Sequence, residues 1–303
     1  MDQQSKAYLH ALAAVFFWST VASAFKLSLR VLSPIQLLLY AAFVSALMLL
    51  LILALQGRLA VLRTYSRRDY LNSLILGFLN PFLYYVVLFK AYDLLPGQEA
   101  QPLNYTWAIA LAVLSVPLLK QRIRLVSLLA ILISFIGVYV ISTRGEVFSL
   151  HFTDPLGVSL ALGSSVIWAL FWIFNIRDRR DEVAKLFLSF AFGFGFTLIL
   201  ALLSGELIGP DGEWITPGWS GAAGAAYVGL FEMGLTFVLW LRALKLSRTT
   251  ALVSNLIFLS PFVSLVLLHF VVGEHIYSSS VIGLVFIIGG IALQRCTERV
   301  RSG

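Results

Sequence analysis

The chain is divided into ten apolar stretches separated by short polar loops. A run of about 20 apolar residues is long enough for a helix to cross the hydrocarbon core of a bilayer. In lipid, helices and closed barrels are the structures that satisfy every backbone polar group. The sequence therefore predicts an all-α polytopic membrane protein with ten transmembrane helices, at residues 8–29, 34–56, 70–92, 97–119, 124–142, 154–176, 182–204, 216–241, 249–272 and 277–294.

Positive charge is distributed unevenly between the two sets of loops that these spans create. Eighteen of the 22 Lys and Arg residues lie in the two tails and the even-numbered loops, whereas the odd-numbered loops hold only Arg30 and Arg144. Cytoplasmic loops carry such an excess of cations, so the bias predicts that both termini are cytoplasmic. The cations of the tails and even-numbered loops are Lys6; Arg58, Arg63, Arg67 and Arg68; Lys120, Arg122 and Arg124; Arg177, Arg179, Arg180 and Lys185; Arg242, Lys245 and Arg248; and Arg295, Arg299 and Arg301.

The composition excludes several other classes of protein. Hydrophobic residues make up 59% of the chain and charged residues only 12%, too few charges to cover a soluble domain of this size. In a soluble protein the net charge of +7 would suggest a nucleic-acid partner. Here the cytoplasmic loops explain it, because they face anionic headgroups. We therefore expect a lipid bilayer and no nucleic acid as partner.

The loops are too short to hold a soluble domain, and the chain lacks the G-x-x-x-x-G-K-[ST] spacing of a phosphate-binding loop. Any energy that the protein uses must then come from a gradient. The four histidines have no spacing with carboxylates that indicates a metal site, and no motif indicates a cofactor.

The chain repeats itself at an interval of about 150 residues, the mark of a duplicated architecture. Gly77 corresponds to Gly229, for example, and Trp18 to Trp168. Each half then holds five helices, and an odd number inverts the second half relative to the first. We expect one repeat over residues 1–150 and an inverted one over 151–303. Secondary transporters use inverted repeats, with the substrate site near the midplane.

At this level the sequence resembles the drug/metabolite transporter superfamily, of the kind built from two EamA-type domains. The residues that carry the resemblance are Trp18-Ser19 with Lys26 in the first span, and Asn255, Ser260-Pro261 and Gly273-Glu274-His275 around the ninth. The first half departs from this pattern, because Lys120-Gln121 stands in place of Gly273-Glu274 and no proline matches Pro261. Strict functional symmetry is therefore not expected.

Within the superfamily, the length and the aromatic-rich core resemble the bacterial aromatic amino-acid exporters. This resemblance implies a multi-pass protein of a bacterial inner membrane that exports amino acids.

Glu232 is the most unusual residue of the chain, because it falls near the middle of the eighth span. A carboxylate there costs roughly 2.5–3.5 kcal/mol on insertion scales, so it normally faces a cavity or a partner. It is interpreted either as a proton-coupling or cation-binding group or as a hydrogen-bonded lock between helices. Its counterpart in the first half is Asn80. Pro81 follows Asn80 and is expected to interrupt the third span.

Two lysines lie within spans, near the ends predicted to face outside. Lys90 is expected to pair with Asp93, three residues further along the helix. Lys26 is expected either to extend to the interface or to face the cavity.

Aromatic and polar residues within the spans suggest a central cavity, in which aromatic faces take an apolar body and amides or hydroxyls take the polar ends. The alternative is that the aromatics pack the core and the small polar residues join helices. The candidate substrate-binding residues are Trp18, Ser23, Asn80, Tyr84, Asn104, Trp107, Trp168, Trp172, Glu232 and Asn255.

The favoured function is therefore a secondary transporter that exports aromatic or other amphipathic amino acids and related small metabolites by alternating access. The alternative is a proton-coupled exporter of multiple drugs or aromatic cations that uses Glu232. An intramembrane enzyme would need paired catalytic groups, and Glu232 is the only acid expected deep in the bilayer. A channel would need a symmetric polar ring. The sequence leaves open the substrate, the coupling ion, the direction of transport and the oligomeric state, a monomer included.

Overall fold

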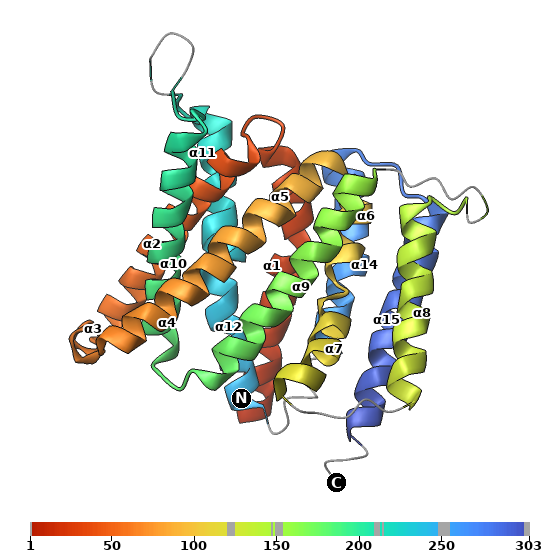
Figure 1. Ribbon diagram of the computed structural model, residues 1–303, viewed down its shortest axis with the longest axis horizontal. Helices are drawn as coiled ribbons and strands as arrows, with labels where there is room; N and C mark the ends of the chain where they lie inside the picture. Colours follow the sequence, from red (N-terminus) through yellow and green to blue (C-terminus); the bar gives the residue numbers. More distant parts are fainter. Residues whose placement is uncertain are drawn as a thin grey trace.

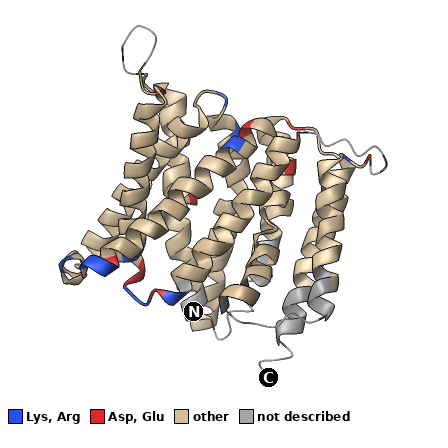
Figure 2. Cartoon of the chain, in the orientation of Figure 1, with Lys and Arg blue, Asp and Glu red and all other residues tan. Residues whose placement is uncertain are grey.

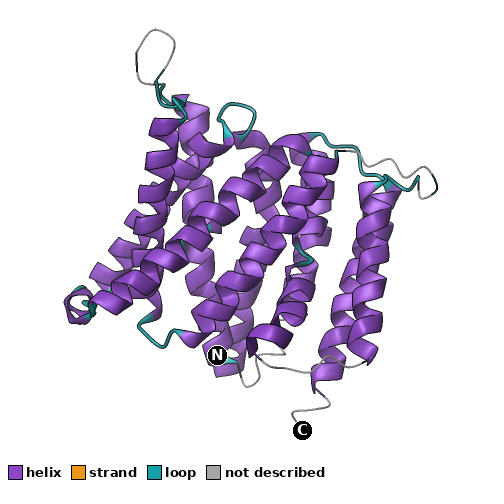
Figure 3. Cartoon of the chain, in the orientation of Figure 1, coloured by secondary structure: helices purple, strands orange, loops and turns teal. Residues whose placement is uncertain are grey.

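A computed structural model describes residues 2–119, 125–146, 148, 154–208, 213, 215–247 and 255–299. The described chain is almost entirely helical, with short connections at the two ends of a bundle (Figure 3). The sequence features at Lys120, Gln121, Arg122, Arg124, Arg248 and Arg301 lie outside the described residues, as does the side chain of Asn255.

In its described residues, the first half of the bundle contains eight α-helices and one π-helical segment. These are α1 (Gln3–Ser28), α2 (Pro34–Leu55), a short α3 (Ala60–Thr64), the run α4 (Arg67–Gly77), η1 (Phe78–Leu83) and α5 (Tyr84–Leu94), then α6 (Gly97–Asn104), α7 (Trp107–Leu119) and α8 (Leu125–Ser142). The second half contains α9 (Pro155–Arg177), α10 (Glu182–Leu203), the run α11 (Gly218–Tyr227), η2 (Val228–Glu232) and α12 (Leu235–Leu246), the run η3 (Asn255–Phe258), α14 (Leu259–Leu267) and η4 (Leu268–Val272), and α15 (Ser278–Arg299).

Several helix starts are fixed by local chemistry that the sequence displays. The side chain of Ser33 accepts a hydrogen bond from the backbone of Gln36 and Pro34 opens α2, while Asp154 and Pro155 begin α9 in the same way. Such residues satisfy backbone N–H groups that have no partner within the helix, and proline at the first helical position loses nothing. The loop boundaries of the predicted spans follow from these caps.

The described helices and helix runs match the ten predicted spans. Six of them are long and apolar enough to cross a membrane, and shorter apolar helices cover Ile131–Ser142, Leu259–Val272 and Ser278–Leu293. The interruption predicted at Pro81 is present, because Asn80 has extended backbone angles (φ −148°, ψ 120°) inside η1. The fourth span was expected as one helix, but α6 ends at Asn104 and α7 begins at Trp107.

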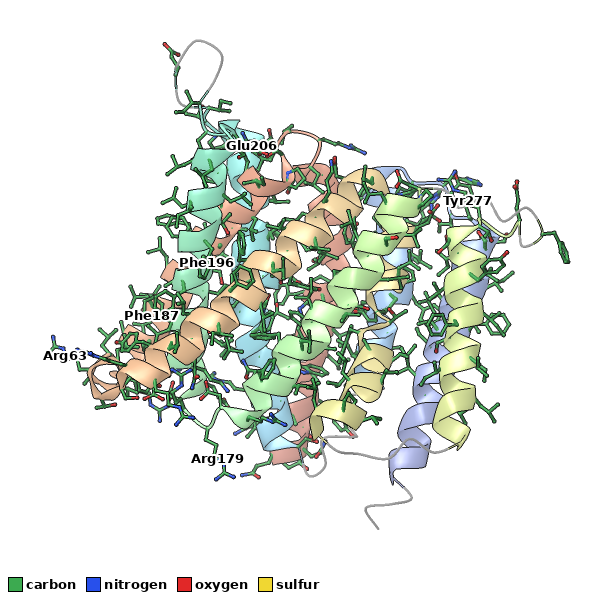
Figure 4. All side chains as sticks on the ribbon, viewed as in Figure 1. Arg63, Arg179, Phe187, Phe196, Glu206 and Tyr277 are labelled. Atoms are coloured by element: carbon green, nitrogen blue, oxygen red, sulfur yellow. The ribbon has the colours of Figure 1, made fainter. Side chains whose placement is uncertain are left out.

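The two halves run in opposite directions through the bundle. Helix α1 begins, and α15 ends, at one end of the molecule, whereas α9, the first helix of the second half, begins at the other (Figure 1). We call these the terminus end and the opposite end. Most of the described Lys and Arg residues lie at the terminus end (Figure 2). Arg63 and Arg179 lie there, and Glu206 and Tyr277 at the opposite end (Figure 4).

The halves interlock rather than stack as separate bodies. Helix α10 of the second half packs on α2 and α4 of the first, α9 packs on α5 and α7, and α12 and α14 pack on α1. Helices α8 and α15 form a pair at one edge (Figure 1). Their backbones touch, because a Cβ atom on Gly137 would lie 2.5 Å from the Gly283 carbonyl oxygen.

Candidate substrate cavity

A cavity of about 550 Å³ lies between the halves. Helix α1 contributes Trp18, Val21 and Phe25 to it. The remaining lining residues come from both repeats: Tyr84, Leu88, Tyr92, Gln101, Asn104, Tyr105, Trp107, Leu111, Trp168, Trp172, Asn175, Asp178, Arg179, Arg180, Glu182, Lys185, Glu232, Trp240 and Ile257. The volume falls in the usual range for sites that enclose a small molecule.

Aromatic rings form much of the wall and are fixed by packing on each other. The ring of Tyr84 lies 4.6 Å from that of Trp168, centroid to centroid, and Trp172 meets Trp168 edge-on at 6.0 Å. The rings of Trp18 and Trp240, which also line the cavity, are 5.3 Å apart. Edge-on and tilted contacts at these separations are favourable arrangements of aromatic quadrupoles, so the apolar wall is held by contacts between helices of both repeats.

Glu232 places a carboxyl group in this aromatic wall. The hydroxyl of Tyr85 donates to Oε1 of Glu232 at 3.0 Å. The side chain of Trp18 also contributes a hydrogen bond to the carboxyl group. The second carboxyl oxygen, Oε2, is buried without a hydrogen bond of standard geometry, and only 7% of the residue is exposed. A buried acceptor without a partner costs free energy. A ligand that donates a hydrogen bond to Oε2 would remove this cost.

A chain of polar side chains joins α5, α6 and α9 beside the cavity. The hydroxyl of Tyr84 donates to Oδ1 of Asn104 at 3.3 Å, and Nδ2 of Asn104 donates to Oγ of Ser164 at 2.8 Å. Next to this chain, Oγ1 of Thr106 donates to Oγ of Ser165 at 3.1 Å. The amide of Asn104 is therefore held in one orientation by a partner on each side.

Seven of the ten candidate substrate-binding residues line this one cavity: Trp18, Tyr84, Asn104, Trp107, Trp168, Trp172 and Glu232. Ser23 and Asn80 are buried but are not among its lining residues. A helix advances 100° per residue, so Ser23 lies about 140° around α1 from Trp18. Val21 and Phe25 lie closer to the face of α1 that carries Trp18. Asn80 is fully buried, and neither polar atom of its amide has a hydrogen-bond partner.

The sequence reasoning missed two lining residues in particular, Gln101 and Trp240. Gln101 lies one helical turn before Asn104, and that spacing on one face of α6 was a usable indication. Its Oε1 is buried without a hydrogen-bond partner, like Oε2 of Glu232. Trp240 lies on α12, about two helical turns beyond Glu232. The helix is broken at Gly234 between the two residues, so helical spacing from Glu232 does not predict which way Trp240 points.

Glu232 is not the only fully buried acid, contrary to the sequence expectation. The side chain of Glu99 is 1% exposed and accepts from Nε of Arg144 at 2.8 Å, at the opposite end of the bundle. The sequence placed Arg144 in a loop and gave no reason to pair it with Glu99. A buried carboxylate of this kind requires its charge partner, so the pair joins α6 to the end of α8.

At the terminus end the cavity reaches the loop between α9 and α10. Arg180 in this loop contacts Asp178 at 2.5 Å, and donates to the Asp69 carbonyl oxygen at 2.7 Å and to Ser73 Oγ at 2.9 Å, both on α4. Burial alone would raise the pKa of Asp178, but the hydrogen bonds and charge of Arg180 hold that pKa below its usual value. Lys185 is buried beside it and donates to the carbonyl oxygens of Asn175 and Asp178.

At the opposite end no loop residue lines the cavity in the described part of the chain. Lys26 is not among the lining residues of the cavity. Its Nζ donates to the carbonyl oxygens of Tyr92 and Leu95 at 2.8 and 3.1 Å. Lys90 pairs with Asp93 at 2.6 Å, which confirms that prediction.

Comparisons with known proteins place this architecture in a family. Residues 5–143 and 155–295 each match the EamA-like transporter family. An uncharacterized transporter of Clostridium kluyveri is 30% identical over 190 residues, which is 59% of this chain and 58% of that protein. The chain thus spans less than two thirds of that relative. The uncharacterized transporter YvbV of Bacillus subtilis is 25% identical over 76% of this chain and 73% of its own.

The fold is also known from experiment. A protein of known crystal structure aligns with a TM-score of 0.66 over 99% of both chains, at 21% identity, a level at which the likeness concerns the fold alone. The two matched segments together cover most of the residues, and each corresponds to one half of the inverted bundle. The chain is therefore a multi-pass membrane protein that belongs to the EamA-like transporter family, within the drug/metabolite transporter superfamily.

Proposed function

We propose that this transporter is a secondary carrier that exports amphipathic amino acids, aromatic ones first, and related small metabolites. The observation that carries the proposal is the cavity itself, which combines aromatic walls with buried acceptors that have no partner. Trp168 and Tyr84 offer faces to an apolar side chain. Oε2 of Glu232 and Oε1 of Gln101 offer acceptors to an ammonium group.

Alternating access would move the site between the two ends of the bundle. The cavity reaches the loop of Asp178 and Arg180 at the terminus end, and the turns of the opposite end lie outside its lining. With the cation bias of the loops, we propose that the terminus end faces the cytoplasm of a bacterial cell and that the protein lies in the inner membrane. The units that rock against each other would be residues 1–150 and 151–303.

Orientation can be tested by labelling single cysteines with an impermeant maleimide, after Cys296, the single native cysteine, is replaced by Ser. Ser66 precedes α4 at the terminus end, and Trp219, 90% exposed, lies in the first turn of α11. In intact cells we expect Trp219→Cys to react and Ser66→Cys to be protected. The reverse pattern would place the termini outside.

The transport proposal is tested with purified protein in liposomes, by measuring exchange of labelled amino acids across a panel that includes aromatic, aliphatic and acidic ones. Trp168→Ala should reduce exchange of aromatic substrates by roughly two- to tenfold, because stacking on an aromatic face is worth about 0.5–1.5 kcal/mol beyond the buried area and about 1.4 kcal/mol corresponds to a factor of ten. Phe174→Ala is the matched control, because Phe174 is on the same helix and 41% exposed. Equal exchange by both variants would mean that the substrate binds elsewhere.

A second candidate is a proton-coupled exporter of aromatic cations, favoured by the partnerless Oε2 of Glu232 inside the aromatic wall. A cation held by a carboxylate and by ring faces is a recognised arrangement. Glu232→Gln separates the two functions. A cation exporter should lose accumulation driven by a pH gradient, while a carrier of zwitterions should keep exchange down a concentration gradient. Accumulation of a cationic dye that survives Glu232→Gln would exclude the second candidate.

A further inference from the structure

The turn between α5 and α6, at the opposite end, is bonded to the second repeat by one carboxylate. Oε1 of Glu274 accepts from the backbone N–H of Gly97 at 2.8 Å, and Oε2 accepts from that of Gln98 at 3.2 Å. The first N–H groups of a helix have no partner within it and carry the positive end of its dipole. Glu274 therefore satisfies two such groups of α6 from a loop that belongs to the other half of the protein.

Lys26 holds the same turn from the other side. Its ammonium group bonds to the carbonyl oxygens of Tyr92 and Leu95, near the negative end of α5. The backbone between these two clamps lies close to its neighbours, because a Cβ atom on Gly97 would be 2.7 Å from Leu268 and 3.3 Å from Cγ of Lys26. The turn is thus held by opposite charges, Lys26 from the first repeat and Glu274 from the second.

The helix that begins at this turn leads to the cavity. Gln98, in its first turn, donates from Nε2 to the His275 carbonyl oxygen at 2.5 Å and accepts from the Tyr277 N–H at 2.9 Å. Gln101, one turn further along, and Asn104, the last residue of α6, line the cavity. A short helix of eight residues therefore connects the bonds that close the opposite end to the groups that would meet a substrate.

We propose that Glu274 is the latch of the opposite end. Its two bonds to α6 form in the state in which the cavity reaches the terminus end, and they break when the opposite end opens. This rests on the alternating access proposed above. A ligand can shift such an equilibrium only through contacts that differ between the two states. Contacts of the substrate with Gln101 and Asn104 meet this condition, because moving α6 moves these residues and the latch together.

The test measures the latch without any substrate. Val21 lines the cavity on α1, so Val21→Cys in a Cys296→Ser background reports which end gives access. An impermeant maleimide is applied to sealed vesicles of each orientation. From the opposite end, labelling should be slow in the parent, about tenfold faster in Glu274→Ala, and intermediate in Glu274→Gln, which keeps one acceptor oxygen; charge-assisted bonds are about twice as strong as neutral ones.

Asp93→Asn is the matched control. Asp93 is an acid at the same end, but its partner Lys90 lies on the same helix, so the pair does not join the repeats. Its labelling should equal that of the parent. If Glu274→Ala does not fold, which size-exclusion chromatography in detergent would reveal, Glu274→Gln carries the test alone. Parent-like labelling of the Glu274 variants, or equally faster labelling of Asp93→Asn, would overturn the latch.

The labelling result is independent of the transport result. Faster labelling of the Glu274 variants with no exchange of any amino acid in liposomes would leave the latch in place and reject the proposed function. Unchanged labelling of the Glu274 variants together with clear amino-acid exchange would reject the latch and leave the proposed function in place.

Discussion

The two interrupted helices, α4–η1–α5 and α11–η2–α12, occupy equivalent places in the repeats but carry different chemistry. Each packs on a helix of the other half through one glycine. A Cβ atom on Gly77 would lie 2.3 Å from the Ser189 carbonyl oxygen of α10, and one on Gly229 would lie 2.5 Å from the Ala41 carbonyl oxygen of α2. In both cases the nearest side chain to this Cβ position belongs to the residue three positions after the one whose carbonyl oxygen is touched: Phe192 after Ser189, and Val44 after Ala41.

Three residues after each glycine the halves diverge. The first repeat has Asn80, fully buried and away from the cavity lining, followed by Pro81. The second has Glu232, whose free carboxyl oxygen is buried at the cavity. Both interruptions contain an N–H that bonds five residues back, Tyr84 to Leu79 and Met233 to Val228, but the first is extended at Asn80 and the second departs from helical angles at Gly234. The difference teaches that equivalent places in a duplicated fold can hold side chains of different chemistry, a buried amide in one half and a buried carboxyl group in the other.

The largest expected effect is a difference in substrate exchange between variants at the equivalent positions Glu232 and Asn80. Glu232→Ala should lower exchange roughly 10- to 100-fold, because a hydrogen bond to a charged group contributes about 1.5–3 kcal/mol and about 1.4 kcal/mol corresponds to a factor of ten. Asn80→Ala should change exchange less than about twofold, because truncation of a side chain away from the cavity removes no substrate contact. Exchange rates in liposomes measure both. Equal losses at the two positions would make the halves functionally symmetric.

The next effect concerns packing and should be the same in both halves. Gly77→Ala and Gly229→Ala should each destabilise the protein by about 1–3 kcal/mol, because overpacking forces backbone shifts. Thermal unfolding in detergent measures the loss. Gly195→Ala is the control, because no atom lies within 4 Å of its Cβ position, and in a helix the substitution should be neutral or stabilising. A loss at only one of the two glycines would contradict equivalent packing.

The smallest effect tests the neighbour of Glu232. Tyr85→Phe removes the hydroxyl that donates to Oε1 and should lower exchange a few-fold, because a hydrogen bond contributes about 0.5–1.5 kcal/mol net. Tyr70→Phe is a control at the terminus end, where the hydroxyl bonds only to the Leu62 carbonyl oxygen. Exchange by Tyr85→Phe equal to that of the control would show that Glu232 is positioned without Tyr85.

Much of the fold was readable in the sequence because a bilayer leaves a chain few choices. Span length, cation bias and the repeat of Gly77 at Gly229 indicated the bundle and its inversion. The interruption at Pro81 followed from the missing N–H of proline. The break between Asn104 and Trp107 did not, because no residue there forbids a helix.

For the cavity, residue type gave the right class of side chain but not always the right direction. Trp18, Tyr84 and Trp168 were chosen because aromatic residues at depth favour a cavity, and all three line it. Ser23 was chosen as a polar residue within a span, but it lies on another face of α1 than Trp18. Gln101 was missed although it lies one helical turn before the candidate Asn104, a spacing that places both on one face of α6.

The sequence by itself determined the class of protein, the approximate spans and the pairing of equivalent positions, because hydrophobic length and helical spacing are local properties. The tertiary structure decided which polar groups meet. Arg144 with Glu99, Glu274 with the first turn of α6, and Tyr85 with Glu232 are separated by 45, 177 or 176, and 147 residues along the chain. Such contacts exist only once helices distant in the sequence pack together, since each one depends on the rotation and depth of two helices at once.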